Sequence, residues 1–397
     1  MASLLDLNLQ ERNSKNLGTF NNLYLDSTAK AIFSHYSCAN GNDHYTQKEI
    51  NQWRDFCGKY LLTLCHADKC DDFQFHTASG SSEAVYLGLL TLKRHFQESH
   101  PGCTRLNIIV PTNAHVCWRK AADFLDLEIK HLPIDLETMS LNPEQAINLI
   151  DENTIGICAT LGTPTTLLFD PVQHLNNLLE TYFQKTGHFV PIHVDAASGG
   201  FVAPFVFPEL VWDFRLRQVY SINISSHKYG MVYPALGWLL TRNLSCLKKM
   251  THGNDYLGSY MQRISLQFSY SAAHVVTQYH QLATHGHQGY QEKTTLLYSL
   301  GDRLKQALQQ CPELEVYSWP GYHLPGIVFS AKNEQFHLSV LADNLKKRGW
   351  YLPVYHLPDP LATKKVARIV IRHGFSVPHI QQLIADIAKV LAVDAIC

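Results

Sequence analysis

The sequence lacks any apolar run of the roughly 18 residues that a membrane-crossing helix requires. Its N-terminus has no basic start followed by an apolar core, so we expect neither a membrane span nor a secretory signal. An excess of positive charge is also missing, because the formal net charge is −1 and no Lys/Arg-rich run occurs. This charge balance disfavours nucleic acid and anionic membrane surfaces as partners.

The sequence also lacks the spacings typical of disulfide and metal sites. Its ten cysteines stand at irregular positions, unlike those of a small disulfide-stapled domain. We therefore expect a reducing compartment and a cytoplasmic location. Cys65, His66 and Cys70 form a short cluster, but no second Cys/His pair at matching spacing follows to complete a four-ligand zinc site. No metal centre is expected.

The chain has enough apolar residues for a sizeable core and is longer than one ordinary domain. It has 397 residues, of which 46% are hydrophobic and 17% charged. No repeat, linker or low-complexity segment is present. Residues 1–55 are mixed and polar, and we expect an N-terminal arm laid on another surface. A large domain over residues 56–292 and a small α+β domain over residues 293–397 are predicted to follow.

Strand-like and helix-like segments alternate in the middle of the chain. A helix is predicted after Ser82, because Val85, Leu89, Leu92 and Phe96 share one face. Strands are predicted at 106–110, 128–132, 154–160, 190–194, 219–224 and 237–240, with helices at 114–124, from 142, and at 174–185. This order predicts a mostly parallel sheet covered by helices. Towards the C-terminus, helices at 294–310 and around 380–391 flank short strands at 315–317, 327–329 and 368–371.

Two of the predicted strands end in polar residues. The first is followed by Asp195, and the second by Ser225, Ser226, His227 and Lys228. Ligands of open α/β sheets bind at the carboxyl ends of the strands. A carboxylate at one strand end and a Ser-Ser-His-Lys cluster at another suit an aromatic cofactor that carries a phosphate.

Lys228 and Asp195 each have a catalytic and an ordinary interpretation. An unprotonated lysine amine forms an imine with an aldehyde, whereas a lone lysine after a strand is usually a surface residue. A buried carboxylate needs a partner, which a protonated pyridine nitrogen can provide. Asp195 could instead cap a following helix.

Further candidates lie at two predicted helix starts. Ser81 and Ser82 begin a helix whose backbone N–H groups could bind an anion, and Ser225 and His227 add donors for the same phosphate. His115 could stack on a flat cofactor ring. In a chain with 22 histidines, a cap or a surface residue is the ordinary alternative for His115.

Several motifs carry a resemblance to a known family. They are GSSEA (80–84), VCWRK (116–120), DENTIG (151–156), HVDAASGGFVAPF (193–205), WDFRL (212–216), SIN (221–223), HKYG (227–230), DYLG (255–258) and RIVIRHGF (368–375). With them the chain resembles the group II pyridoxal-phosphate-dependent decarboxylases, and glutamate decarboxylases most closely. HVDAASGGFVAPF and HKYG at this separation are the most specific motifs.

The resemblance implies an α/β fold of the aspartate aminotransferase-like type (fold type I of the pyridoxal-phosphate-dependent transferases). It also implies a homodimer with active sites at the interface and pyridoxal 5'-phosphate bound to Lys228. Asp195 would contact the pyridinium nitrogen, and His115, Thr160 and Ala197 would lie against the ring. The phosphate would be bound by Ser81, Ser82, Ser225 and His227, and by Ser269 of the partner subunit.

For the substrate, the resemblance implies that Arg368 grips the α-carboxylate and that Tyr256, on a mobile segment, or His115 delivers a proton to Cα. His35 aligns with a threonine that helps to hold the substrate side chain. The chain departs from glutamate decarboxylases in having His115 at a glutamine position, a shortened segment at 36–60, and no glycine at 163–168.

The expected reaction is decarboxylation of an L-amino acid at Cα, with glutamate, which would give 4-aminobutanoate and CO2, as the leading substrate. Aromatic amino acids, histidine or aspartate are alternative substrates. A carbon–carbon lyase of the sphingosine-phosphate lyase type is an alternative reaction. A non-catalytic binding or regulatory relative is disfavoured, because such a scaffold has no need to keep Lys228, Asp195 and Arg368 together.

Overall fold

The structure is a computed structural model that describes residues 9–41, 44–67, 73–242, 252–254, 261–264, 266–267 and 269–394. Its N-terminal part forms three helices, α1 (Leu9–Ser14), α2 (Ser27–Tyr36) and α3 (His44–Leu64). The polar composition of this part did not predict helices. Asp26 caps α2 by accepting a hydrogen bond from the backbone N–H of Ala29, as a residue at the helix N-cap commonly does.

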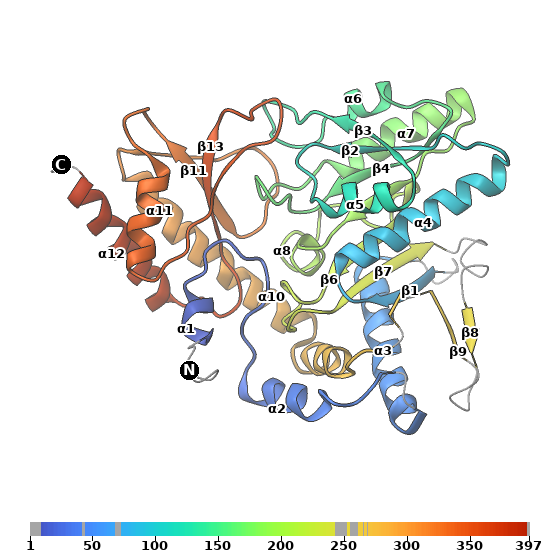
Figure 1. Cartoon of the computed structure of the whole chain (residues 1–397), viewed down its shortest axis with the longest axis horizontal. Helices are drawn as coiled ribbons and strands as arrows, with labels where there is room; N and C mark the ends of the chain where they lie inside the picture. Colours follow the sequence, from blue (N-terminus) through green and yellow to red (C-terminus); the bar gives the residue numbers. More distant parts are fainter. Residues whose placement is uncertain are drawn as a thin grey trace.

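The centre of the molecule is a seven-stranded sheet in the order β1-β7-β6-β5-β4-β2-β3 (Figure 1). The strands are β1 (Phe73–Ala78), β2 (Asn107–Pro111), β3 (Glu128–Leu132), β4 (Thr154–Thr160), β5 (Ile192–Asp195), β6 (Val219–Ser225) and β7 (Gly237–Arg242). Only β7 pairs in antiparallel fashion with its neighbours, and the other pairs are parallel. The predicted mostly parallel sheet is confirmed.

Helices connect and cover these strands, and a short antiparallel strand pair lies outside the sheet. The helices are α4 (Ser81–Ser99), α5 (Cys117–Phe124), α6 (Pro143–Asn148), α7 (Val172–Thr186), the 3-10 helix η1 (Gly199–Phe201) and α8 (Ala203–Val206), and the pair is β8 (His252–Asn254) with β9 (Met261–Arg263). Asn142 caps α6 as its position before Pro143 predicted. Helix α5 begins at Cys117 rather than Ala114, so His115 precedes the helix.

The C-terminal part is a four-stranded antiparallel sheet with helices. Its elements are α10 (Ala273–Gln309), β10 (Leu314–Val316), β11 (Gly326–Ala331), α11 (Leu338–Lys347), β12 (Val354–His356), β13 (Lys365–Val370) and α12 (Val377–Asp394), with the strand order β10-β11-β13-β12. Helix α10 kinks at Gly286 and continues across position 292. The proposed domain limits near residues 55 and 292 therefore fall inside helices, and they stay a prediction.

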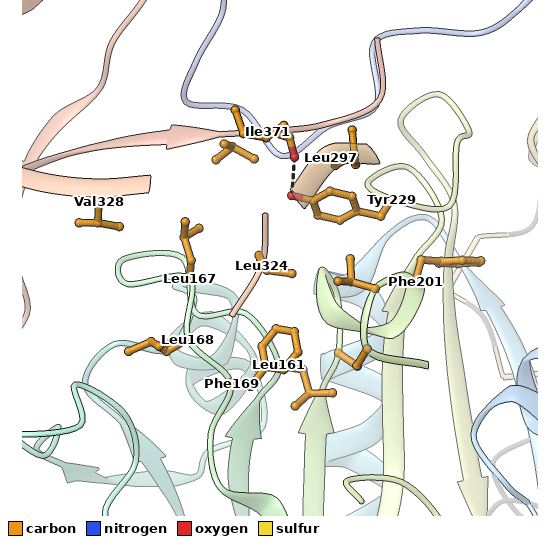
Figure 2. Close-up of a cluster of buried hydrophobic side chains, with 14 of the residues drawn as sticks. Leu161, Leu167, Leu168, Phe169, Phe201, Tyr229, Leu297, Leu324, Val328 and Ile371 are labelled. Atoms are coloured by element: carbon orange, nitrogen blue, oxygen red, sulfur yellow. Dashed lines mark hydrogen bonds between the residues drawn. The ribbon is translucent and has the colours of Figure 1, made fainter. Parts of the chain in front are cut away.

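One apolar cluster joins the loops at the carboxyl ends of the large sheet to the C-terminal part (Figure 2). The large-sheet side contributes Leu161, Leu167, Leu168, Phe169, Phe201 and Tyr229, and the C-terminal side contributes Leu297, Leu324, Val328 and Ile371. The hydroxyl group of Tyr229 donates to the carbonyl of Ile371 at 3.1 Å. This packing fixes the C-terminal part beside the strand ends that carry the predicted site.

Leu167 has backbone strain within this cluster, in the segment where the sequence lacks a glycine. Its φ is +68°, a left-handed conformation that disfavours L side chains, while its side chain is only 2% exposed. We expect Leu167→Ala to lower the free energy of unfolding by about 3 kcal/mol. Leu167→Gly should be roughly 0.5–1 kcal/mol more stable than the alanine variant, because glycine accepts this φ.

Urea unfolding of both variants measures this difference. Leu161→Ala with Leu161→Gly is the matched control, since Leu161 belongs to the same cluster and has no positive φ. At position 161 the glycine variant should be less stable than the alanine variant. If the glycine variant were the less stable one at position 167 as well, the strain at Leu167 would be contradicted.

Candidate active site

Parallel pairing places three strand ends side by side. Asp195, at the end of β5, is in register with Thr160 of β4 on one side and with Asn223 of β6 on the other. Ser225 ends β6, and its hydroxyl oxygen lies 2.6 Å from that of Ser81 at the start of α4. Residues predicted from separate motifs thus converge at one edge of the sheet.

Asp195 is a buried carboxylate surrounded by neutral donors. It is 2% exposed, and its Oδ1 accepts from Asn223 Nδ2 at 2.8 Å and from the Ala197 N–H at 3.2 Å. Its Oδ2 accepts from Trp118 Nε1 at 3.0 Å. Among the described residues, no Lys, Arg or His nitrogen forms a salt bridge with it. A buried carboxylate without a cation suits a positively charged ligand group.

Asp195 does not cap a helix. The short helix η1 begins only at Gly199, and its preceding residue, Ser198, makes no capping hydrogen bond with its side chain. The ordinary interpretation of Asp195 is therefore wrong.

The Lys228 side chain is partly buried. Its Nζ donates to Ser198 Oγ at 2.9 Å and lies 5.3 Å from the centre of the Phe20 ring. Burial lowers the pKa of Lys228, and the Asp195 carboxylate partly opposes this shift. A lowered pKa increases the fraction of neutral amine, which is the form that attacks a carbonyl carbon.

The start of α4 carries Ser81 and Ser82, the residues predicted to bind an anion. Glu83 accepts a hydrogen bond from the Ser79 N–H at 2.7 Å, which holds the turn that presents Ser81 and Ser82. Gly237 allows this turn to approach β7, because a Cβ at that position would lie 2.6 Å from the carbonyl carbon of Gly80. Helix N-termini favour bound anions through free N–H groups and the helix dipole.

His227 borders the same turn. Its Nδ1 donates to the Leu236 carbonyl at 3.0 Å, which leaves Nε2 for another partner. Burial lowers the pKa of His227 to about 4, so the ring is neutral near pH 7. A phosphate beside Nε2 would favour protonation and oppose this shift.

His115 is exposed and lies two residues before the first residue of α5, where its Nδ1 accepts from the Cys117 N–H at 3.2 Å. Partial burial lowers its pKa, with smaller influences from Asp195 and Lys228. The ring therefore stabilises the helix start and also lies within electrostatic reach of the site.

Arg368 faces this site from β13 of the C-terminal sheet. Its Nη2 donates to the Gly18 carbonyl at 2.8 Å, and its guanidinium carbon lies 4.5 Å from the centre of the Phe20 ring. Its Nε is buried and has no hydrogen-bond partner among the described residues. Burial lowers the pKa of Arg368. A buried donor without a partner suits an anionic ligand group.

Phe20 contacts both cations, since its ring lies beside Lys228 and beside Arg368. The segment that carries it bridges the two halves of the molecule: the Val370 N–H donates to the Leu17 carbonyl, and the Asn22 N–H donates to the His227 carbonyl. Nothing in the arm sequence predicted this position, beyond an aromatic residue within a polar stretch.

Other predicted residues have different surroundings. The Thr160 N–H donates to Asp170 at 2.7 Å, and the Ala197 carbonyl accepts from the Ser225 N–H. Ser269 is exposed and borders a pocket near Leu236, and no described hydrogen bond joins it to Ser81 or Ser225.

His35 and Tyr256 are not joined to this cluster in the described structure. His35 is exposed on α2, where its ring meets that of Tyr36 at 4.8 Å. Tyr256 lies outside the described residues. The described part contains no group of three His, Cys, Asp or Glu residues suited to a metal. None of its helices is both long and apolar enough to cross a membrane.

Comparisons with known proteins identify the family of this chain. The pyridoxal-dependent decarboxylase conserved domain matches residues 63–332. Glutamate decarboxylase beta of Listeria innocua is 34% identical over 382 residues, which cover 94% of this chain and 82% of the relative. Glutamate decarboxylase of Petunia hybrida is 38% identical over 318 residues, which cover 79% of this chain and 63% of the relative.

Solved structures agree as well. Glutamate decarboxylase of Lactobacillus brevis superposes with a TM-score of 0.92 at 31% identity, covering 98% of this chain and 90% of that one. The sphingosine-1-phosphate lyase of Burkholderia pseudomallei, with a TM-score of 0.83 at 20% identity, shares the fold over 98% of this chain and 89% of its own. The predicted fold type and the predicted cofactor, pyridoxal 5'-phosphate, are confirmed. The chain belongs to the pyridoxal-dependent decarboxylase family and is an amino-acid carboxy-lyase.

Proposed function

We propose that this enzyme removes the α-carboxyl group of L-glutamate and releases CO2 and 4-aminobutanoate. The convergence of Lys228, Asp195 and Arg368 around one strand edge carries the proposal for the reaction. The proposal for glutamate is supported by relatives that are 33–38% identical and are named glutamate decarboxylases.

The described side chains fit the cofactor. Lys228 would bind its aldehyde carbon, Asp195 would hold its ring nitrogen, and His115, Thr160 and Ala197 would border its ring. Ser81, Ser82, Ser225 and His227 would bind the phosphate. When bound, pyridoxal phosphate supplies an electron sink for the bond that breaks at Cα. The Asp195 carboxylate would keep this sink effective, because it would stabilise a positive charge on the ring nitrogen.

Arg368 would bind the α-carboxylate of the substrate. Its free Nε and the neighbouring guanidinium N–H groups form a planar fork that matches a carboxylate. The Gly18 carbonyl fixes one nitrogen of this fork, so the group is oriented before the substrate arrives. The proton that replaces CO2 at Cα would come from Tyr256 or from His115. With Nδ1 of His115 accepting from Cys117, the proton of the neutral ring is on Nε2.

We further propose a cytoplasmic homodimer in which His35 and Ser269 act in the site of the partner subunit. Both residues are exposed in a single chain, which leaves them accessible to a second copy. The seven described cysteines are free thiols, in keeping with a reducing compartment. Light scattering should give a mass near twice the 45.0 kDa of one chain, and a mass equal to one chain would contradict the shared site.

CO2 release from single amino acids tests the reaction and the substrate. Purified enzyme loaded with pyridoxal phosphate should act on L-glutamate much faster than on aspartate, histidine or aromatic amino acids. Faster release from one of the others would replace glutamate as the substrate. No release from any of them, together with cleavage of a phosphorylated amino alcohol, would replace the decarboxylase with a carbon–carbon lyase.

Phe20 should affect substrate use without affecting cofactor retention. Phe20→Ala removes the ring that lies beside both Lys228 and Arg368, so Arg368 loses a contact worth about 0.5–2 kcal/mol. We expect kcat/KM for glutamate to fall roughly tenfold, while the visible absorbance of the bound cofactor stays. Tyr24→Ala, in the same arm, is the control, because its side chain is 49% exposed. An equal loss in both variants would contradict a role for the Phe20 ring.

A further inference from the structure

We propose that His193 and Ser221 are positioning residues that fix the Asn223 amide so that its N–H donates to Asp195. Through this relay, they hold the carboxylate oriented towards the ring nitrogen of the cofactor. The inference rests on the proposed role of Asp195 in cofactor binding.

Three hydrogen bonds join four side chains in a chain in which each donates to the next, from Ser221 through His193 and Asn223 to Asp195. The Ser221 hydroxyl lies 2.7 Å from His193 Nδ1, and His193 Nε2 lies 2.7 Å from Asn223 Oδ1. Asn223 Nδ2 then donates to Asp195 Oδ1 at 2.8 Å. Because Asn223 Oδ1 can only accept, His193 must donate from Nε2, and its Nδ1 must accept from the Ser221 hydroxyl.

The sheet register builds this relay. His193 and Asp195 are two residues apart on β5, and Ser221 and Asn223 are two residues apart on β6. In the parallel pairing of these strands, His193 is in register with Ser221, and Asp195 is in register with Asn223. Alternate residues of a strand share one face, so all four side chains lie on the same face. Two short patterns, His-Val-Asp and Ser-Ile-Asn, therefore encode the relay when their strands pair.

Burial makes each bond of the relay hard to replace by water. His193, Ser221 and Asn223 are 0% exposed. The Trp118 ring lies edge-on to the imidazole, with ring centres 5.1 Å apart. On another side Gly88 leaves no space for a side chain, since a Cβ there would lie 2.5 Å from His193 Cε1. Burial also lowers the pKa of His193, which favours the neutral ring that this arrangement needs.

The orientation of the Asn223 amide must be fixed because the group has a donor, the NH2, on one side and an acceptor, the carbonyl oxygen, on the other. Turned the other way, its oxygen would point at the Asp195 carboxylate oxygen, and neither atom could donate a hydrogen bond. The donor from His193 holds the amide oxygen on the far side. Trp118 donates to the other carboxylate oxygen independently of the relay.

The test compares the binding of two cofactors by purified, cofactor-free protein. One is pyridoxal phosphate, and the other is an analogue with a C–H group in place of the ring nitrogen, which Asp195 cannot hold. His193→Leu should weaken the binding of pyridoxal phosphate by about tenfold or more, which is the effect of losing one hydrogen bond to a charged group. The analogue should bind the variant and the wild type equally.

Two variants and a control separate positioning from folding. His193→Gln keeps an N–H near the Nε2 position and should restore most of the affinity. Ser221→Ala removes only the hydrogen bond that fixes the imidazole tautomer. It should therefore weaken the binding of pyridoxal phosphate by a smaller factor than His193→Leu does. His76→Leu is the control, because His76 Nε2 is buried without a described partner in β1. It should bind both cofactors as the wild type does.

The outcomes are distinguishable. Unchanged pyridoxal phosphate binding by folded His193→Leu and Ser221→Ala variants would overturn the inference and leave the proposed function intact. If the variants bound both cofactors more weakly by the same factor, the relay would have a merely structural role, and the inference would also be overturned. If the wild type bound both cofactors equally, the proposed role of Asp195 would fail instead.

Discussion

The Lys228→Ala variant is expected to lose the visible imine absorbance and to lower kcat for the amino-acid substrate by roughly a thousandfold or more. Among the described residues of this site, the Lys228 amine combines a hydrogen bond to Ser198 with a pKa that burial lowers. Alanine leaves the proposed phosphate-binding residues Ser81 and Ser225 in place. The variant should therefore still bind the cofactor, but without a covalent bond.

Absorbance spectra of the wild type and the variant, recorded with excess pyridoxal phosphate and again after its removal, check this expectation. Lys185→Ala in α7 is the control, since it removes a lysine from the last turn of a helix away from the strand ends. A Lys228→Ala variant that keeps the imine band would place the covalent link on another residue.

The second large effect is expected at Arg368. Arg368→Gln should lower kcat/KM by at least about 30-fold, which corresponds to about 2 kcal/mol, because the substrate carboxylate would lose a charged and oriented partner. The imine absorbance should stay, since none of the hydrogen bonds of Arg368 reaches Lys228 or Asp195.

Arg372→Gln is the matched control for Arg368. Arg372 also holds the N-terminal arm, by donating to the carbonyls of Asn13 and Asn16. Its loss should lower stability through the arm but leave KM for the substrate nearly unchanged. An equal loss of kcat/KM in the two variants would mean that Arg368 acts through the arm rather than on the substrate carboxylate.

Much of the large sheet was predictable because its strands are short apolar runs bounded by turn residues. The limits of β3 and β4 agree with the prediction, and β6 differs from it by one residue. The start of α5 was predicted three residues early. Its first turn is preceded by a residue whose side chain, His115, bonds to the Cys117 N–H, and periodicity does not detect such a bond.

The convergence of Asp195, Ser225 and Ser81 was predictable for a physical reason. Parallel strands deliver their carboxyl-terminal residues to one edge, so separate motifs must meet there. Contacts between segments that are far apart in the sequence were harder to predict. Phe20 reaches the site because a backbone hydrogen bond from Val370 of β13 holds the arm at Leu17, and no local pattern in a polar arm encodes that contact.

The relay behind Asp195 shows the same limit. His193 and Ser221 look like ordinary polar residues in buried strands, and their partnership depends on a register that only pairing of β5 with β6 defines. The roles of Tyr256, Ser269 and His35 stay predictions. They depend on a segment outside the described residues or on a second copy of the chain.

Borohydride reduction followed by peptide mapping tests the central claim most directly. The reagent converts an imine between the cofactor and a lysine into a stable secondary amine, so the modified lysine can be identified by mass. The phosphopyridoxyl group is predicted on the peptide that contains Lys228, at close to one per chain, and this peptide should be unmodified without borohydride. A label on a different lysine, or no label on enzyme that is saturated with pyridoxal phosphate, would contradict the assignment of the site.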